Sequence, residues 1–133
     1  MDHRHFHILY IEDQPEAVEM VRLALRVLGC EVRGAPDGSC GLQMMRSLQP
    51  DLVLLDLMLP GLDGWQVRDA MRRDPQLRDV PVVVVTAETR LLDGDESVLP
   101  PADAYIIKPF SIAELRATVG SMLARLPQTV PGC

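Results

Sequence analysis

The chain has 133 residues, enough for one domain with a hydrophobic core of its own. Hydrophobic residues make up 47% of the chain and charged residues 24%, the balance of a soluble globular protein. Acidic residues outnumber basic ones by 19 to 13, for a formal net charge of −6, and aromatic residues make up only 4%, so we expect no direct nucleic-acid binding.

Short apolar runs alternate along the chain with segments of helical periodicity. In chain order, the runs predicted as strands cover residues 6–11, 31–35, 52–57, 80–85 and 105–108. The segments between them predict helices over residues 15–28, 37–48, 63–73 and 111–126. This alternation predicts parallel βαβ units and a doubly wound α/β sheet.

Capping residues support the predicted helix ends. Asp37 and Asp63 stand where they can cap two helices, and Ser111 with Glu114 has the spacing of a capping box. Gly29 suits the end of the first helix.

A fourth helix is expected between residues 88 and 105, but the sequence there is unfavourable. Gly94 interrupts it and Pro100–Pro101 ends it, so we predict a short or partly unwound helix that is more mobile than the others. Residues 1–126 are predicted to form one domain, and residues 127–133 a flexible tail or the start of a linker.

The chain has no predicted feature of a membrane or secreted protein. Its apolar runs are too short to span a bilayer, and its first residues lack the apolar region of a signal peptide. The three cysteines are odd in number and have no C-x-x-C spacing, which disfavours a disulfide framework or a zinc site. We therefore expect a cytoplasmic protein.

Polar residues stand at or just after the carboxyl ends of four of the predicted strands. Glu12 and Asp13 follow the first strand, Asp56 lies in the third, Thr86 follows the fourth, and Lys108 ends the fifth. Ligands of open α/β sheets bind beyond the carboxyl ends of the strands, so these side chains should gather at one edge.

Their chemistry predicts a magnesium-dependent phosphoryl site. Asp56 lies in an apolar run, where a carboxylate must be paired, neutralised or bound to a cation. Three crowded carboxylates repel one another, and a hard cation with oxygen ligands, Mg²⁺ rather than Zn²⁺, would relieve that repulsion. Lys108 can supply a positive charge to a phosphoryl oxygen, and an aspartate carboxylate is a competent nucleophile toward phosphorus.

Four strings of this sequence resemble the receiver (CheY-like) domain of two-component response regulators: ILYIEDQPE, LVLLDLMLPGLDG, VVVVTA and AYIIKPF. The likeness covers roughly residues 6–126, with the motifs in the family's order and spacing. The resemblance implies a flavodoxin-like sheet of order 2-1-3-4-5 with five helices, and a bound Mg²⁺ for which Mn²⁺ can substitute. It also implies phosphoryl transfer from a histidine kinase or histidine phosphotransfer protein to a module that acts on a downstream effector. Such a module is not an enzyme and promotes only its own phosphorylation and dephosphorylation.

The resemblance also implies roles for individual residues. Asp56 would be the phosphoacceptor and, with Asp13, a direct metal ligand. Glu12 would act on the metal through a water molecule, and Met58 would offer its backbone carbonyl.

Further residues would bind the phosphoryl group or respond to it. Thr86 would bind the group and Lys108 would pair with it, while Tyr105 would turn inward as the switch aromatic residue. A half-buried core position is almost equally consistent with Tyr105. The family's Lys–Pro bond is usually cis, so a cis peptide is expected before Pro109.

Three positions around the site would tune access and phosphoryl lifetime. Ala87 is small enough to leave room for a donor, and Met58 and Glu88 occupy the two variable flanking positions. The sequence departs from the family at residues 101–103, Pro-Ala-Asp, where Gly-Ala usually precedes the acidic residue, which puts the family's dimer geometry in doubt.

Two other functions stay open at this point. One is a receiver that docks a partner without phosphorylation. The other is a haloacid-dehalogenase-type phosphatase, but that class requires a second aspartate at the position that Met58 occupies.

Two features near the strand starts have simpler interpretations. His3, His5 and His7 alternate and would share one strand face, which suits either metal binding or, as we favour, a flanking segment with adventitious metal affinity. Asp51 is interpreted as a solvated residue at a strand start.

Overall fold

The computed structural model describes residues 5–57, 61, 63–87 and 99–126. Five strands lie in this part of the chain: β1 (Phe6–Ile11), β2 (Cys30–Ala35), β3 (Leu52–Asp56), β4 (Val82–Thr86) and β5 (Ala104–Ile107). The helices described are α1 (Pro15–Leu25), the short 3-10 helix η1 (Arg26–Leu28), α2 (Gly38–Leu48), α3 (Gly64–Arg73) and α4 (Ile112–Ala124). Among these helices, none is long and apolar enough to cross a lipid bilayer.

The strands form one parallel sheet of order β2-β1-β3-β4-β5, which confirms the predicted flavodoxin-like topology. Because all strands run in the same direction, their carboxyl ends lie at one edge. The register places Asp56 beside Val85, and Thr86 beside Ile107. The last residues of β3, β4 and β5 are therefore neighbours.

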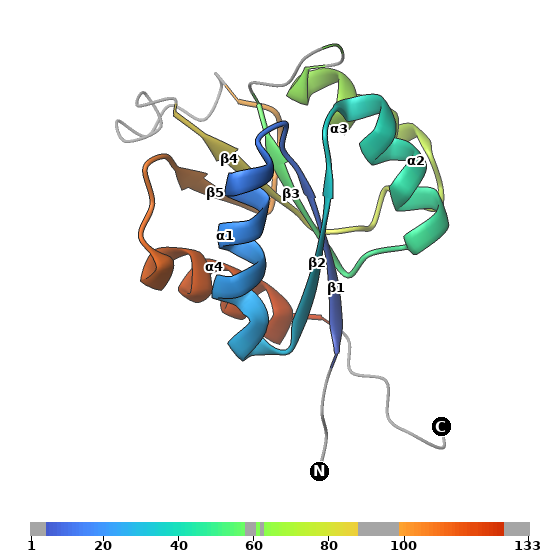
Figure 1. The fold of residues 1–133 in the computed structure, drawn as a ribbon. Coiled ribbons are helices and arrows are strands. Elements are labelled where there is room, and N and C mark those ends of the chain that lie inside the picture. The colour runs from blue at the N-terminus through green and yellow to red at the C-terminus, as the bar shows by residue number, and fades with distance from the viewer. Residues whose placement is uncertain (1–4, 58–60, 62, 88–98, 127–133) are drawn as a thin grey trace, which may run out of the picture.

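Helices cover both faces of the sheet, α1 and α4 on one side and α2 and α3 on the other (Figure 1). The alternation of β1 divides its side chains between the two cores: Ile8 and Tyr10 pack with α1 and α4, and Leu9 and Ile11 pack with α2 and α3. A strand buried on both faces needs apolar residues throughout, which explains the continuous runs of the sequence.

Side-chain caps begin three of the helices. The Asp37 side chain accepts a hydrogen bond from the backbone N–H of Cys40 at 2.8 Å. The Ser111 hydroxyl accepts one from the Glu114 N–H at 3.0 Å, but the reciprocal pair of a capping box is formed by Asp63 and Gln66. Glutamine was not part of the predicted pattern, although its side-chain oxygen serves the same purpose.

Several predicted boundaries need correction by a few residues. The first helix is α-helical only to Leu25, because its last turn tightens into η1 before Gly29, at φ 76°, ends it. β4 begins at Val82, after Pro81, which has no N–H to donate to a neighbouring strand. β5 covers Ala104–Ile107, so Lys108 follows the strand.

Two predictions fall on residues that the structure does not describe. Residues 88–98, which contain most of the expected irregular helix, lie outside the described residues. The predicted tail at 127–133 lies outside them as well. Within the described segment after 98, residues 99–103 have neither helix nor strand structure.

Candidate functional site

The carboxyl edge of the sheet places three polar side chains in the protein interior. Asp56 and Thr86 are the last residues of β3 and β4, and Glu12 follows β1 with its N–H bonded to the Ala35 carbonyl at 2.9 Å. Their exposures are only 3% for Asp56, 4% for Thr86 and 4% for Glu12. They are the buried polar or charged residues of the described chain.

Lys108 joins two of these groups. Its backbone N–H extends the β4–β5 pairing by donating to the Thr86 carbonyl at 2.7 Å, and its side chain turns to the carboxylates. The ammonium lies 3.1 Å from Glu12 Oε2 and donates a close hydrogen bond to Asp56 Oδ2. The structure thus brings together residues that are 96 and 52 positions apart in the chain.

The site is crowded with negative charge. Burial, the neighbouring Asp56 and the nearby Asp13 raise the pKa of Glu12 to about 7, although the hydrogen bond from Lys108 opposes them. Burial alone would lower the pKa of Lys108, but its hydrogen bonds to Asp56 and Glu12 outweigh burial and raise it. Lys108 therefore stays charged, but its single positive charge does not balance the negative charge of the carboxylates around it.

Tyr10 is a site residue that the sequence interpretation missed. Its buried hydroxyl donates to Glu12 Oε2 at 3.2 Å, and the Gln14 N–H donates to Glu12 Oε1 at 3.2 Å. Burial and the charges of Glu12 and Asp56 raise the pKa of Tyr10. The signal was the strand period, because a residue two positions before Glu12 on β1 has its side chain on the same side.

These donors suit a hard divalent cation. The carboxylates of Glu12 and Asp56 contact the ammonium of Lys108, and Asp13 lies close to Glu12, so three carboxylates gather around one positive charge. All the available side-chain donors are oxygens, the ligand type of Mg²⁺. Asp13 and Asp56 could bind such an ion directly and Glu12 through a water molecule.

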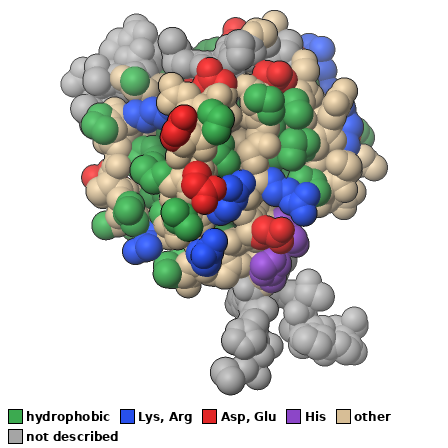
Figure 2. All heavy atoms as spheres, viewed as in Figure 1, with side chains coloured by type: hydrophobic (Ala, Val, Ile, Leu, Met, Phe, Trp, Pro, Cys, Tyr) green, Lys and Arg blue, Asp and Glu red, His purple; other side chains and the backbone are tan. Residues whose placement is uncertain are grey.

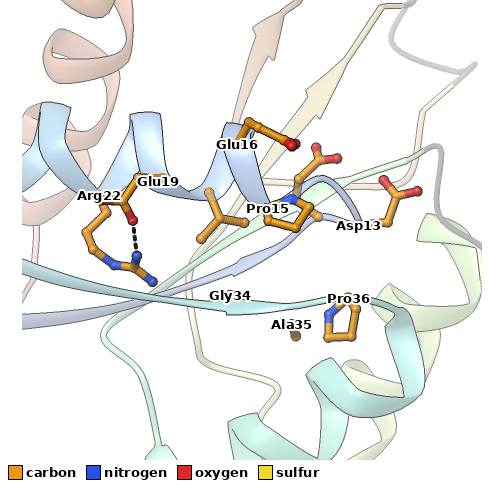
Figure 3. A pocket seen from close by; sticks show the side chains of 10 residues that line it. Asp13, Pro15, Glu16, Glu19, Arg22, Gly34, Ala35 and Pro36 are labelled. Carbon is orange, nitrogen blue, oxygen red and sulfur yellow. Dashed lines mark hydrogen bonds and ion pairs between the residues drawn. The ribbon is translucent and has the colours of Figure 1, made fainter.

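A hollow of about 570 Å³ adjoins the acidic group, between the start of α1 and the end of β2. Asp13, Glu16 and Pro36 line it together with apolar Val18, and the Arg22–Glu19 ion pair lies at the end away from Asp13 (Figure 3). Asp13 is exposed at this opening and Glu12 also lines the hollow, so these two carboxylates adjoin solvent on the α1 side.

The predicted switch residue is held by the segment before β5. The Tyr105 hydroxyl donates to the Pro100 carbonyl at 3.0 Å and accepts from the Ala102 N–H at 3.2 Å. Tyr105 is half-buried against the core on the α2–α3 face. An inward rotation of its ring would have to break both hydrogen bonds.

The remaining predicted positions are only partly described. Ala87 is exposed directly after Thr86, and the Lys108–Pro109 peptide bond is cis. Met58 and Glu88 lie outside the described residues, so their expected tuning and metal roles are not addressed by the geometry.

Sequence comparison gives a consistent set of relatives. The profile of the response regulator receiver domain matches residues 8–120. The chain is 40% identical over 118 residues to the DNA-binding dual master transcriptional regulator RpaA of Synechocystis sp., covering 89% of this chain and 49% of RpaA. It is 41% identical over 125 residues to the DNA-binding response regulator MtrA of Mycobacterium tuberculosis, covering 94% of this chain and 54% of MtrA. The chain spans about half the length of these relatives.

Solved structures with the same architecture support this result. A putative response regulator from Chloroflexus aurantiacus superposes with a TM-score of 0.79 at 33% identity, covering 92% of this chain and 100% of that one. The signal receiver domain of a histidine kinase from Syntrophus aciditrophicus gives a TM-score of 0.82 at 26% identity, covering 96% and 97% of the two chains.

Proposed function

The chain belongs to the response regulator receiver domain family, a family of signalling modules rather than classical enzymes, and from this premise we propose that Asp56 is its phosphoacceptor. The observation that carries the proposal is the burial of the Asp56 carboxylate at the carboxyl end of β3, in contact with Lys108 and beside Glu12. We assign residues 1–126 to this domain.

The proposed reaction forms one Asp56 Oδ–P bond and breaks the N–P bond of a phosphohistidine donor. The electron pair of the broken bond returns to the imidazole nitrogen of the donor. Lys108 moves from its contact with Asp56 Oδ2 to pair with a phosphoryl oxygen, and the Thr86 hydroxyl donates to another. Mg²⁺ held by Asp13 and Asp56 would neutralise the oxygens of the incoming group. Tyr10 and Gln14 keep Glu12 oriented throughout.

We propose that phosphorylation is communicated through Thr86 and Tyr105. When the Thr86 hydroxyl turns to the phosphoryl group, Tyr105 follows it inward. Its hydroxyl must then leave the Pro100 carbonyl and the Ala102 N–H, which releases the backbone before β5. That segment is therefore the expected source of the signal to a downstream effector.

The phosphodonor is proposed to be a histidine kinase or a histidine phosphotransfer protein that docks beside α1. This helix starts directly after the acidic residues and exposes Met20 by 42%, Leu23 by 52% and, just beyond it in η1, Val27 by 69%. These spacings place the three side chains on neighbouring turns. Apolar side chains are exposed on this part of the surface (Figure 2).

The free thiols of Cys30 and Cys40 support a reducing, cytoplasmic location for the protein.

The test is phosphorylation by acetyl phosphate in the presence of Mg²⁺ or Mn²⁺, followed by intact-mass spectrometry. We expect one base-labile phosphoryl group on the parent protein, none on Asp56→Asn, and one on the control Asp69→Asn, whose exposed carboxylate pairs with Arg73 at 2.8 Å. An unmodified parent protein would contradict the proposal and favour a docking receiver. Many turnovers of a phosphate ester would favour a phosphatase instead.

A further inference from the structure

A second group of possible metal ligands lies at the opposite, amino end of the sheet. His5 Nε2 lies 3.0 Å from Glu31 Oε2, and His7 Nδ1 lies 3.5 Å from the same oxygen. The two imidazole rings meet edge to face with their centroids 5.1 Å apart. The ligand atoms of the three residues all lie within 4.8 Å of one another.

The parallel pairing of β1 and β2 brings these side chains together. His7 is the register partner of Glu31, so both project from the same face of the sheet. Two residues earlier in the chain, His5 shares that face. It is the face on which Leu9 and Ile11 contact α2 and α3.

The backbone around the group is fixed before any ligand binds. The His7 N–H donates to Asp51 Oδ2 at 2.8 Å, and the Asp51 N–H donates to the His7 carbonyl at 2.7 Å. The Phe6 N–H donates to the Gly29 carbonyl at 3.0 Å. Binding a ligand here would not require a strand to be ordered, which lowers its cost.

We propose that His5, His7 and the Glu31 carboxylate bind one first-row transition-metal ion, with Zn²⁺ as the reference ion. Two imidazole nitrogens and one carboxylate oxygen are the donors that Zn²⁺, Ni²⁺ and Cu²⁺ prefer, and they form the three-ligand protein set of an open zinc site. Figure 2 shows the histidine side chains at the surface against an acidic side chain, so water can complete the coordination.

The charges around the group are compatible with this arrangement. Arg33 lies 3.6 Å from Glu31 Oε1, the oxygen that does not face the histidines. Glu31 Oε2 is thus left for the metal while Oε1 keeps its arginine partner. An ion pair between Glu31 and protonated histidines is the alternative use of the same contacts, and it requires no metal.

The two metal sites of the molecule would be separate and of different selectivity. Glu12 lies five residues beyond His7, roughly 17 Å along the strand direction. The acidic site offers only oxygen ligands and should take Mg²⁺, whereas the histidine site should not. The proposal does not depend on the phosphoacceptor role of Asp56.

The test is a titration of the full chain with Zn²⁺ in excess Mg²⁺, followed through the imidazole nitrogen signals in ¹H–¹⁵N NMR. We expect one equivalent of Zn²⁺ to shift the ring signals of His5 and His7 together. Zinc held elsewhere, for example by cysteine, would leave these signals in place. Saturating Zn²⁺ without such shifts would overturn the proposal.

Variants then test the ligand set. His5→Gln, His7→Gln and Glu31→Gln should each weaken binding at least about tenfold, since each removes one of three ligands. Asp69→Asn is the carboxylate control and should keep the parent affinity. Unchanged affinity in Glu31→Gln, or an equal loss in Asp69→Asn, would overturn this assignment.

Discussion

At the carboxyl end of the sheet Glu12 is 4% exposed, and burial beside Asp56 and Asp13 raises its pKa to about 7. At the amino end the Glu31 side chain is 41% exposed, and its hydrogen bond with His5, with the charges of Arg33 and His7, lowers its pKa. The carboxylate of Asp74, which follows α3, also has a lowered pKa. The charged form of the carboxylate is therefore disfavoured at the carboxyl edge of the sheet and favoured at the amino edge. We call the first the strained edge and the second the relaxed edge.

The carboxylate pKa values at the two edges differ because the carboxylates have different numbers of hydrogen-bonding partners and different exposure to solvent. The buried carboxylates of Glu12 and Asp56 share Lys108 as a partner. The Asp74 carboxylate instead accepts hydrogen bonds from both the Arg46 side chain and the Gln76 backbone N–H. Removal from water penalises a charge that is not fully compensated, whereas exposed pairs cost and gain little. The strained edge therefore suits Mg²⁺ and phosphoryl binding, whereas the carboxylates of the relaxed edge already have cationic partners of their own.

Loss of Lys108 should have the largest effect on stability. In Lys108→Met, Glu12 and Asp56 stay buried without their shared ammonium, so we expect a loss of about 2 kcal/mol, below the usual cost of a broken buried pair because Lys108 is partly exposed. Urea unfolding in EDTA at pH 7 measures it. The amino-end control is Arg46→Met, which breaks a solvent-screened pair with Asp74 and should cost much less than Lys108→Met. Equal losses would contradict the distinction between the two edges.

The hydroxyl of Tyr10 should contribute a smaller amount. Tyr10→Phe keeps the ring in the core but removes the donor to Glu12 Oε2, and we expect a loss of about 1 kcal/mol in EDTA. Tyr105→Phe is the matched control, because it removes a hydroxyl bonded to backbone outside the acidic group. The Glu12 pKa should rise in Tyr10→Phe and stay constant in Tyr105→Phe. A change in both variants would show that the hydroxyl does not act on Glu12.

Removal of one carboxylate from the strained edge should stabilise the metal-free protein. Asp13 is exposed but close enough to raise the pKa of Glu12, so Asp13→Asn should add about 0.5 kcal/mol in EDTA. The same variant should lose most of the stabilisation that Mg²⁺ gives the parent protein. Glu16→Gln, on the first turn of α1, should change neither value. Destabilisation of Asp13→Asn in EDTA would refute the repulsion argument.

Strand alternation was sufficient to predict a parallel doubly wound sheet, and the residues at the strand ends were sufficient to predict that Glu12, Asp56 and Lys108 converge. The sheet order came from the resemblance to the receiver family and not from the alternation. The sequence was not sufficient for contacts that depend on the register between distant strands. Asp51 is one example: interpreted as a solvated residue, it accepts the His7 N–H.

Local departures from regular helix and strand geometry were also not predicted from the sequence patterns. The tightening of residues 26–28 into η1 and the start of β4 after Pro81 reflect tertiary packing and a missing backbone donor. Tyr10 was predicted only as part of an apolar strand, because periodicity assigns a side chain to a face without saying what its hydroxyl reaches.

The smallest expected effect is a pH dependence at the relaxed edge. The Gln76 backbone N–H, and then Arg46, lower the pKa of Asp74 below its ordinary value of 3.8. Since the unfolded chain binds this proton more readily, the stabilisation is complete above the ordinary value and is lost as the pH falls through the folded value. Asp74→Asn should therefore be less stable than the parent protein at pH 7, and the difference should shrink toward pH 3 in urea unfolding. Arg46→Gln should keep most of this pH dependence, because the Gln76 hydrogen bond is the larger cause. If the stability difference between Asp74→Asn and the parent protein grew on acidification, the pKa of Asp74 would be raised and not lowered by folding. Asp74 would then not be an example of a carboxylate stabilised at the relaxed edge.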